Sequence, residues 1–251
     1  MAAPRASANE VEETLASIAR RFPLEQSEEM GAEVMRIAFY IDLILSRKGR
    51  DVTVCDIGGG RGLFSLGCAA LGMKSILVDV DEDRPLALHR QYGVEVILRD
   101  VIEEGIDFPS ESLDVVTAFH TIEHFHHSPK RLLRSVTSVL KPGGIFALGA
   151  PNCVNLRKRL TVPLGHGKWS TMDRWYEADR FIDHVREPDV DDLRYIANDM
   201  GLVDVEIHGR NFLGLSSPKP FVRRAALLLD KGLRYRPSLC SDIYMLASKP
   251  A

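Results

Sequence analysis

The chain has 251 residues, 45% of them hydrophobic and 27% charged, and its formal net charge is −3 at pH 7. This length suits one large α/β domain with an appendage, and the lack of an overall positive charge argues against a nucleic-acid-binding protein. The four cysteines are widely spaced without a C-x-x-C pair, which favours reduced thiols in a cytoplasmic protein over a zinc ribbon or a disulfide framework.

The N-terminal fifth of the chain is predicted to be helical after a disordered start at residues 1–9. Helices are expected over Glu10–Arg21 and Glu28–Ser46. In the second helix, apolar residues recur at helical spacing and form one stripe: Met30, Val34, Ile37, Ile41 and Leu45. We expect residues 1–50 to be a helical extension whose stripe packs on the main domain, with a lid over the cofactor as the alternative. We expect no signal peptide and no membrane-spanning segment, because the start is small and polar and no long apolar run follows.

From residue 51 to residue 251, short apolar strands alternate with helices, which predicts a parallel sheet in a single α/β domain. The expected strands are 52–57, 75–80, 94–98, 113–119, 144–150, 202–209 and 242–248. The expected helices are 62–72, 83–92, 129–140, 188–200 and 220–233. The turn Lys141-Pro142-Gly143-Gly144 is expected to end a helix before the next strand. Residues 151–187 have no clear period and are expected to form a substrate loop.

The most informative motif joins the first expected strand to the helix after it. The acid Asp56 lies near the end of that strand and is followed by Gly58-Gly59-Gly60-Arg61-Gly62. Glycine accepts a positive φ and lets a ligand approach the backbone, and turns of this kind bind nucleotides in Rossmann-like sheets. Leu63 occupies the place of the third glycine of a dinucleotide fingerprint. A second acid, Asp79, ends the next apolar run.

Five ordered elements between residues 50 and 152 together resemble class I S-adenosylmethionine-dependent methyltransferases. They are the glycine turn with Asp56, the acid Asp79, Leu98-Arg99-Asp100-Val101, the "LEH"-like segment Thr121-Ile122-Glu123-His124, and Leu140–Gly144 followed by Pro151-Asn152. The resemblance implies an α/β, Rossmann-like fold with a seven-stranded, mostly parallel sheet. The last strand would be antiparallel, helices would lie on both faces, and the N-terminal helices would form a cover.

The resemblance also implies which residues bind S-adenosyl-L-methionine. The expected cofactor-binding residues are Asp56, Gly58, Gly60, Gly62, Asp79, Asp100, Val101 and His120. Asp56 would favour the ammonium group of the cofactor, directly or through water, and Asp79 would accept hydrogen bonds from the ribose hydroxyls. Asp100 would accept from the adenine amino group, and the amide of Val101 would serve a ring nitrogen.

Catalytic and substrate-binding residues are predicted less directly than cofactor-binding ones. Methyl transfer from a sulfonium depends mainly on aligning the acceptor, the methyl group and the sulfur, and it does not require a catalytic triad. His184 and His124 are the candidate bases, and for His184 the alternative is anchoring of the loop. Trp175, Tyr176 and Arg186 are candidate substrate-binding residues, and for the aromatic pair the alternative is packing under the loop. No metal site is predicted, since the His and Glu spacing over 120–127 matches no metal motif.

The expected function is transfer of a methyl group to a hydroxyl or amine of a small molecule, such as a sugar, a lipid-linked compound or a secondary metabolite. The alternatives are an NAD(P)-dependent Rossmann oxidoreductase and a non-catalytic S-adenosylmethionine-binding protein. No nucleic-acid partner is expected. The basic segment 221–236 is a candidate for peripheral membrane contact, with a packed helix that exposes a solvated basic face as the alternative.

Overall fold

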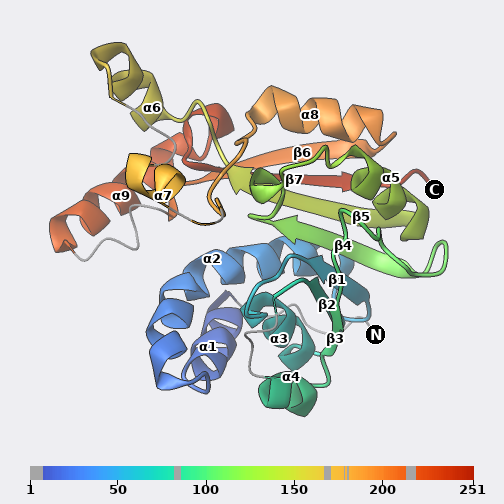
Figure 1. Cartoon of the computed structure of the whole chain (residues 1–251). Helices are drawn as coiled ribbons and strands as arrows, with labels where there is room; N and C mark the ends of the chain where they lie inside the picture. The colour runs from blue at the N-terminus through green and yellow to red at the C-terminus, as the bar shows by residue number, and fades with distance from the viewer. Residues whose placement is uncertain (1–7, 82–85, 167–170, 178, 180, 213–218) are drawn as a thin grey trace.

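A seven-stranded sheet forms the centre of the computed structural model, which describes residues 8–81, 86–166, 171–177, 179, 181–212 and 219–251 (Figure 1). The strand order is β3-β2-β1-β4-β5-β7-β6. Neighbouring strands from β3 to β5 are parallel, whereas β7 is antiparallel to both β5 and β6. The predicted Rossmann-like fold with an antiparallel last strand is therefore confirmed.

The elements follow the predicted order along the chain. The strands are β1 Thr53–Ile57, β2 Lys74–Asp79, β3 Glu95–Leu98, β4 Leu113–Phe119, β5 Leu140–Pro151, β6 Val203–Arg210 and β7 Asp242–Ser248. The helices are α1 Ala8–Ala19, α2 Leu24–Lys48, α3 Leu63–Ala70, α4 Leu86–Tyr92, α5 Lys130–Val139, α6 Leu156–Thr161, α7 Met172–Tyr176, α8 Val190–Asp199 and α9 Pro220–Leu233. The expected disorder over 1–9 falls on residues 1–7, outside the described residues, and on Ala8 and Asn9, which are already helical. The start of the expected helix 83–92 also lies outside the described residues.

Helices cover both faces of the sheet and divide the core into two layers. Side chains alternate between the faces of a strand, so Val54 packs in the layer of α1–α4, whereas its neighbour Cys55 packs in the layer of α5 and α8. Both residues are fully buried. Burial on both faces explains why the central strands read as continuous apolar runs instead of alternating ones.

The N-terminal helices α1 and α2 pack in the same core layer as α3 and α4. Met30 and Ile41 of the α2 stripe are buried, and Val34, Ile37 and Leu45 pack against the same core. Gly67 of α3 makes this packing close, because a Cβ atom there would lie 2.6 Å from Leu15 and 2.7 Å from Ile41. The predicted packing of the stripe on the main domain is confirmed.

Two sequence expectations need correction. The segment Lys141–Gly144 is the irregular start of β5 and not a turn before it. Leu113 pairs with Leu140 while Val115 pairs with Ile145, so the extra residues bulge from the ladder, with Gly143 at a φ of +69°. The span 151–187, expected to lack regular structure, contains α6 and α7. These helices have six and five residues, too few to show a helical period.

The short helices gather with α9 beyond one end of the sheet, on the side to which β4 and β5 point (Figure 1). Helix α6 begins at Asn155, whose side chain accepts a hydrogen bond from the Lys158 amide. Helix α9 has the bounds that the sequence predicts. Across the described part of the chain, no helix combines the length and the apolar character that a membrane crossing needs.

Candidate active site

Two adjoining cavities, each of about 650 Å³, lie at the carboxyl ends of β1, β2 and β4. Open α/β sheets bind ligands at this edge. The edge cavity is lined by Asp79, Asp100, Val101, Thr121, Phe125 and Phe181, among others. The helix cavity is lined by Glu33, Arg36, Tyr40, Gly60, Gly62 and Leu63, among others. Both cavities are lined by Gly58, His120, His124 and Ile182.

The glycine turn after β1 forms the boundary between the cavities. Gly58 has a φ of +68°, and a Cβ atom there would clash with the side chain of Thr121. Gly60 has a φ of +55°, but no atom lies within 4 Å of a Cβ placed on it. The tight turn at Gly58 therefore follows from packing, whereas Gly60 presents its backbone to open space.

The two acids predicted to bind ribose and adenine both line the edge cavity. Asp79 ends β2, and its carboxylate accepts hydrogen bonds from the amides of Gly60, at 2.7 Å, and Asp81, at 2.9 Å. Asp100 follows β3 and accepts from the amide of Ile102 at 2.9 Å through Oδ1, a contact that does not use Oδ2. Val101 lies beside it and is mostly buried.

Asp56 lies deeper than the other acids. Its side chain is buried, its Oδ1 accepts from the Thr117 hydroxyl at 2.7 Å, and its Oδ2 accepts from the Ser65 hydroxyl at 3.1 Å. Burial raises the pKa of Asp56 to about 7, although these two hydrogen bonds favour the ionised form. The carboxyl group thus ties β1 to β4 and α3 beneath the glycine turn, while Asp56 also borders the helix cavity.

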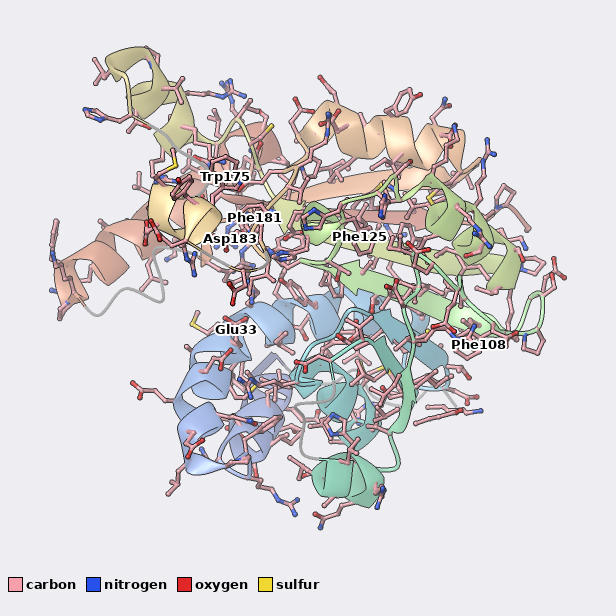
Figure 2. The ribbon with its side chains drawn as sticks, in the orientation of Figure 1. Glu33, Phe108, Phe125, Trp175, Phe181 and Asp183 are labelled. Atoms are coloured by element: carbon pink, nitrogen blue, oxygen red, sulfur yellow. The ribbon has the colours of Figure 1, made fainter. Side chains whose placement is uncertain are left out.

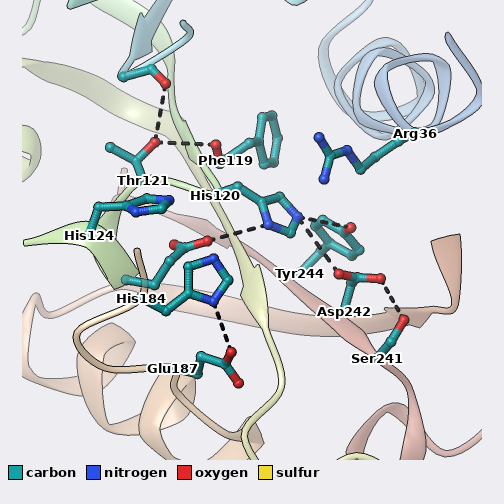
Figure 3. A network of polar contacts seen from close by, with 12 residues as sticks. Arg36, Phe119, His120, Thr121, His124, His184, Glu187, Ser241, Asp242 and Tyr244 are labelled. Atoms are coloured by element: carbon teal, nitrogen blue, oxygen red, sulfur yellow. Dashed lines mark hydrogen bonds and ion pairs between the residues drawn. The ribbon is translucent and has the colours of Figure 1, made fainter. Parts of the chain in front are cut away.

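His120 lies immediately after β4 with a φ of +53°, a conformation that is rare outside glycine. Its amide donates to the carbonyl of Gly149 at 2.8 Å, which holds this backbone in place. Its Nδ1 is 3.3 Å from Glu123 Oε1, and its Nε2 is 3.4 Å from the hydroxyl of Tyr244 and 4.0 Å from Asp242 Oδ1 (Figure 3). Backbone strain of this kind concentrates at functional sites.

Aromatic and charged residues of α2 complete the helix cavity, and the sequence reasoning missed them. Tyr40 stacks on Phe119 with ring centroids 4.0 Å apart, and its hydroxyl is 3.4 Å from that of Tyr244. Burial raises the pKa of both tyrosines, so both are neutral phenols. Arg36 pairs with Glu33, and Figure 2 places Glu33 across from Phe181 and Asp183.

The two predicted bases lie together. His124 lines both cavities, and its Nδ1 is 2.9 Å from the carbonyl of Ile182. The ring of His184 lies 5.0 Å from that of His124, and its Nδ1 is 2.8 Å from Glu187 Oε1 (Figure 3). The hydrogen bond that His184 donates to the Glu187 carboxylate raises the pKa of His184.

The predicted substrate-binding residues lie elsewhere. Trp175 and Tyr176 are 58% and 71% exposed on α7, and Arg186 pairs with Asp192 at 3.1 Å. The described residues that line the two cavities do not include these three. Instead, Phe181 and Ile182 border the cavities from the same span of chain. The span 151–187 thus borders the cavities through Phe181 and Ile182 and not through the residues that the sequence predicts to bind substrate.

The comparisons agree with this geometry. The family model described as "Methyltransferase domain" matches residues 12–207. The chain is 29% identical over 202 residues to a probable S-adenosylmethionine-dependent methyltransferase of Mycobacterium tuberculosis, covering 77% of this chain and 66% of that one. It is 35% identical over 109 residues to a ubiquinone biosynthesis O-methyltransferase of Paramagnetospirillum magneticum, covering 42% of this chain and 43% of that one. The chain thus spans less than two thirds of the length of these relatives.

A solved structure shares the fold. A SAM-dependent methyltransferase from Archaeoglobus fulgidus superposes with a TM-score of 0.58 at 23% identity, over 86% of this chain and 93% of that chain.

Proposed function

Since this chain belongs to the family of S-adenosylmethionine-dependent methyltransferases, we propose that it transfers a methyl group from S-adenosylmethionine to a hydroxyl group of a small molecule. One observation carries the proposal: the edge cavity and the helix cavity meet at Gly58, His120 and His124. One cavity holds the donor and the other the acceptor, and the methyl group passes between them at this junction.

The residues of the edge cavity fit the cofactor. The cofactor would extend from the edge cavity onto the open backbone of Gly60, which lines the adjoining helix cavity next to Gly58. In the edge cavity, the carboxylates of Asp79 and Asp100 offer acceptors for ribose hydroxyls and for an adenine amino group. Val101 supplies an apolar wall beside Asp100. When bound, S-adenosylmethionine supplies the activated methyl group together with its leaving group. The protein aligns the acceptor and excludes water.

The helix cavity suits a small polar acceptor. Tyr40 and Phe64 give it an apolar wall, while Arg36 and Glu33 place charges at its side. The similarity to a ubiquinone biosynthesis O-methyltransferase favours a hydroxyl over an amine as the atom methylated. Sugars, lipid-linked compounds and secondary metabolites all carry such groups.

We propose His120, instead of His184 or His124, as the residue that accepts the proton of the acceptor hydroxyl. His120 lines both cavities, as a base at the junction must. The carboxylates of Glu123 and Asp242 on either side stabilise the positive charge that the ring gains with the proton. His124 also lines both cavities, but the partner of its Nδ1 is the uncharged carbonyl of Ile182, whereas His120 has a carboxylate on each side.

A turnover assay tests this function. S-Adenosylhomocysteine release is measured with pairs of acceptors that differ only in carrying a hydroxyl or an amine. The proposal predicts turnover with members of the hydroxyl series. Turnover with amines alone would contradict the hydroxyl assignment. Tight cofactor binding without turnover across both series would favour the non-catalytic alternative.

A further inference from the structure

We propose that Glu123, His124 and His184 form a binding site for one divalent first-row transition-metal ion next to the junction of the two cavities. One candidate ligand atom from each of the three side chains lies within 4.8 Å of the other two. Two imidazoles and one carboxylate form a common ligand set for zinc and for iron(II), manganese(II) or cobalt(II), and such sites leave positions open for a further ligand.

Backbone hydrogen bonds bring the three residues together from two distant segments. Glu123 and His124 lie in the 3₁₀ turn Ile122–His124 that follows β4. The carbonyl of Glu123 accepts hydrogen bonds from the amides of Val185, at 2.7 Å, and Arg186, at 3.3 Å. These bonds fix the segment of His184 against the turn, so the grouping is a built feature of the fold.

Both histidines are held in the tautomer that a metal needs. A carbonyl oxygen only accepts hydrogen bonds, so the contact of His124 Nδ1 with Ile182 at 2.9 Å requires a proton on Nδ1. His184 Nδ1 faces the carboxylate of Glu187 at 2.8 Å and donates to it in the same way. In the neutral rings, both Nε2 atoms then carry a free lone pair. Lys158 pairs with the same carboxylate and holds it in place. Metal-binding histidines commonly have such partners on their second nitrogen.

The carboxylate of Glu123 is the strongest sign of a missing ligand. The residue is fully buried, and neither carboxylate oxygen accepts a hydrogen bond from the described residues. Nδ1 of His120 lies 3.3 Å from Oε1. A buried carboxylate without hydrogen bonds is costly. A cation between Glu123 and the two histidines would remove that cost.

The position of the site suggests its use, an extension that rests on the proposed function. His124 lines both cavities, so an ion bound to it has its open positions toward their junction. There it would hold the oxygen of the acceptor and increase its acidity, as bound metal ions do for water. We therefore expect the metal to affect acceptor binding and turnover more than cofactor binding.

Metal titration of tag-free protein, stripped by a chelator, tests the site without any turnover. We expect one Co²⁺ ion per chain, seen as visible absorption bands of the bound ion, and one Zn²⁺ ion by calorimetry. Loss of the hydrogen-bond partner of a metal-binding histidine typically lowers metal affinity tenfold to 100-fold, and Glu187→Gln should lower it by about that amount. Glu123→Gln and His184→Asn, which each remove a ligand, should lower the affinity by more. His166→Asn removes an exposed histidine outside both cavities and should leave the affinity unchanged.

Circular dichroism tests whether each variant is folded. If Glu123→Gln, which changes a buried residue, does not fold, the comparison of His184→Asn with His166→Asn tests the proposal. The proposal is wrong if the folded wild type binds no stoichiometric ion, or if Glu123→Gln and His184→Asn bind as tightly as His166→Asn. Removal of the metal should leave the affinity for S-adenosylmethionine unchanged, and this affinity is measured separately on metal-free protein. If the metal-free wild type did not bind S-adenosylmethionine, that result would count against the proposed function and not against the metal site.

Discussion

The amide of Gly60 donates a hydrogen bond to Oδ2 of Asp79 at 2.7 Å, joining the turn after β1 to the end of β2. This contact orients the carboxylate at the edge cavity and holds the open backbone of Gly60 beside it. The two features predicted separately from the sequence, the glycine turn and the second acid, are therefore one unit.

Gly60→Ala should weaken S-adenosylmethionine binding by about tenfold or more, because its Cβ would enter the space into which the ligand fits. It should also destabilise the fold by about 1–2 kcal/mol, since alanine is strained at positive φ. Gly143→Ala is the matched control. Gly143 has a φ of +69°, also with no atom near an added Cβ, but lies in the bulge of β5. Denaturant unfolding should show equal losses of stability in the two variants, and calorimetry should show a loss of affinity in Gly60→Ala only. Equal affinities of the two variants would contradict the placement of S-adenosylmethionine beside Gly60.

Asp56→Asn should change how stability depends on pH. The pKa of Asp56 is raised from its unfolded value of 3.8 to about 7 by burial, so the folded state retains a proton that the unfolded state releases. The stabilisation is complete below the unfolded pKa and is lost as pH rises toward 7, at about 1.4 kcal/mol per pH unit inside this window. Unfolding curves at several pH values should show the difference between wild type and Asp56→Asn changing in this direction. Parallel pH profiles would refute the assignment.

His120→Asn should separate catalysis from cofactor binding. Asparagine tolerates positive φ, so the backbone after β4 is preserved while the imidazole is removed. We expect kcat to fall on the order of 100-fold with little change in the affinity for S-adenosylmethionine. If the affinity fell in proportion to kcat, His120 would be a cofactor-binding residue, as the sequence analysis expects, and not the base.

Exposed apolar and basic residues on α9 predict binding to anionic membranes. Phe221 and Leu228 are 76% and 74% exposed, and the same segment carries Arg224, Lys231 and Arg234. Co-sedimentation with vesicles rich in phosphatidylserine should capture the wild type at low salt, and Leu228→Asp should lower the bound fraction. Tyr195→Asp, which changes an equally exposed residue on α8, is the control. If the vesicles captured both variants equally, the alternative of a packed helix with a solvated basic face would be favoured.

The sheet was predictable because it depends on local pattern. Buried parallel strands give continuous apolar runs. Asp79, Asp100 and His120 each lie at the end of a strand or within two residues after it, so their meeting at one edge follows from parallel pairing. Tyr40 could have been noticed as a polar aromatic residue next to the stripe of α2. Its contact with Tyr244, 204 positions away, could not be predicted, because only the antiparallel insertion of β7 creates it.

The acceptor side was harder to predict for the same reason. Glu123, His124 and His184 meet because the Glu123 carbonyl binds two amides of a segment that has no period of its own. Spacing between ligands in the sequence carries no signal when a long connection separates them. Trp175 and Tyr176 were chosen as aromatic residues in the right span, but α7 exposes them, and Phe181 and Ile182 line the cavities instead.

Calorimetric titration of the wild type and Asp79→Ala with S-adenosylmethionine and with NAD(P) tests the central claim most directly. We expect one S-adenosylmethionine per wild-type chain and no NAD(P) binding. In the folded Asp79→Ala variant we expect an affinity loss on the order of 100-fold, because a charged hydrogen-bonding partner is removed. NAD(P) binding without S-adenosylmethionine binding, or an unchanged affinity in Asp79→Ala, would contradict the assignment of the edge cavity to S-adenosylmethionine.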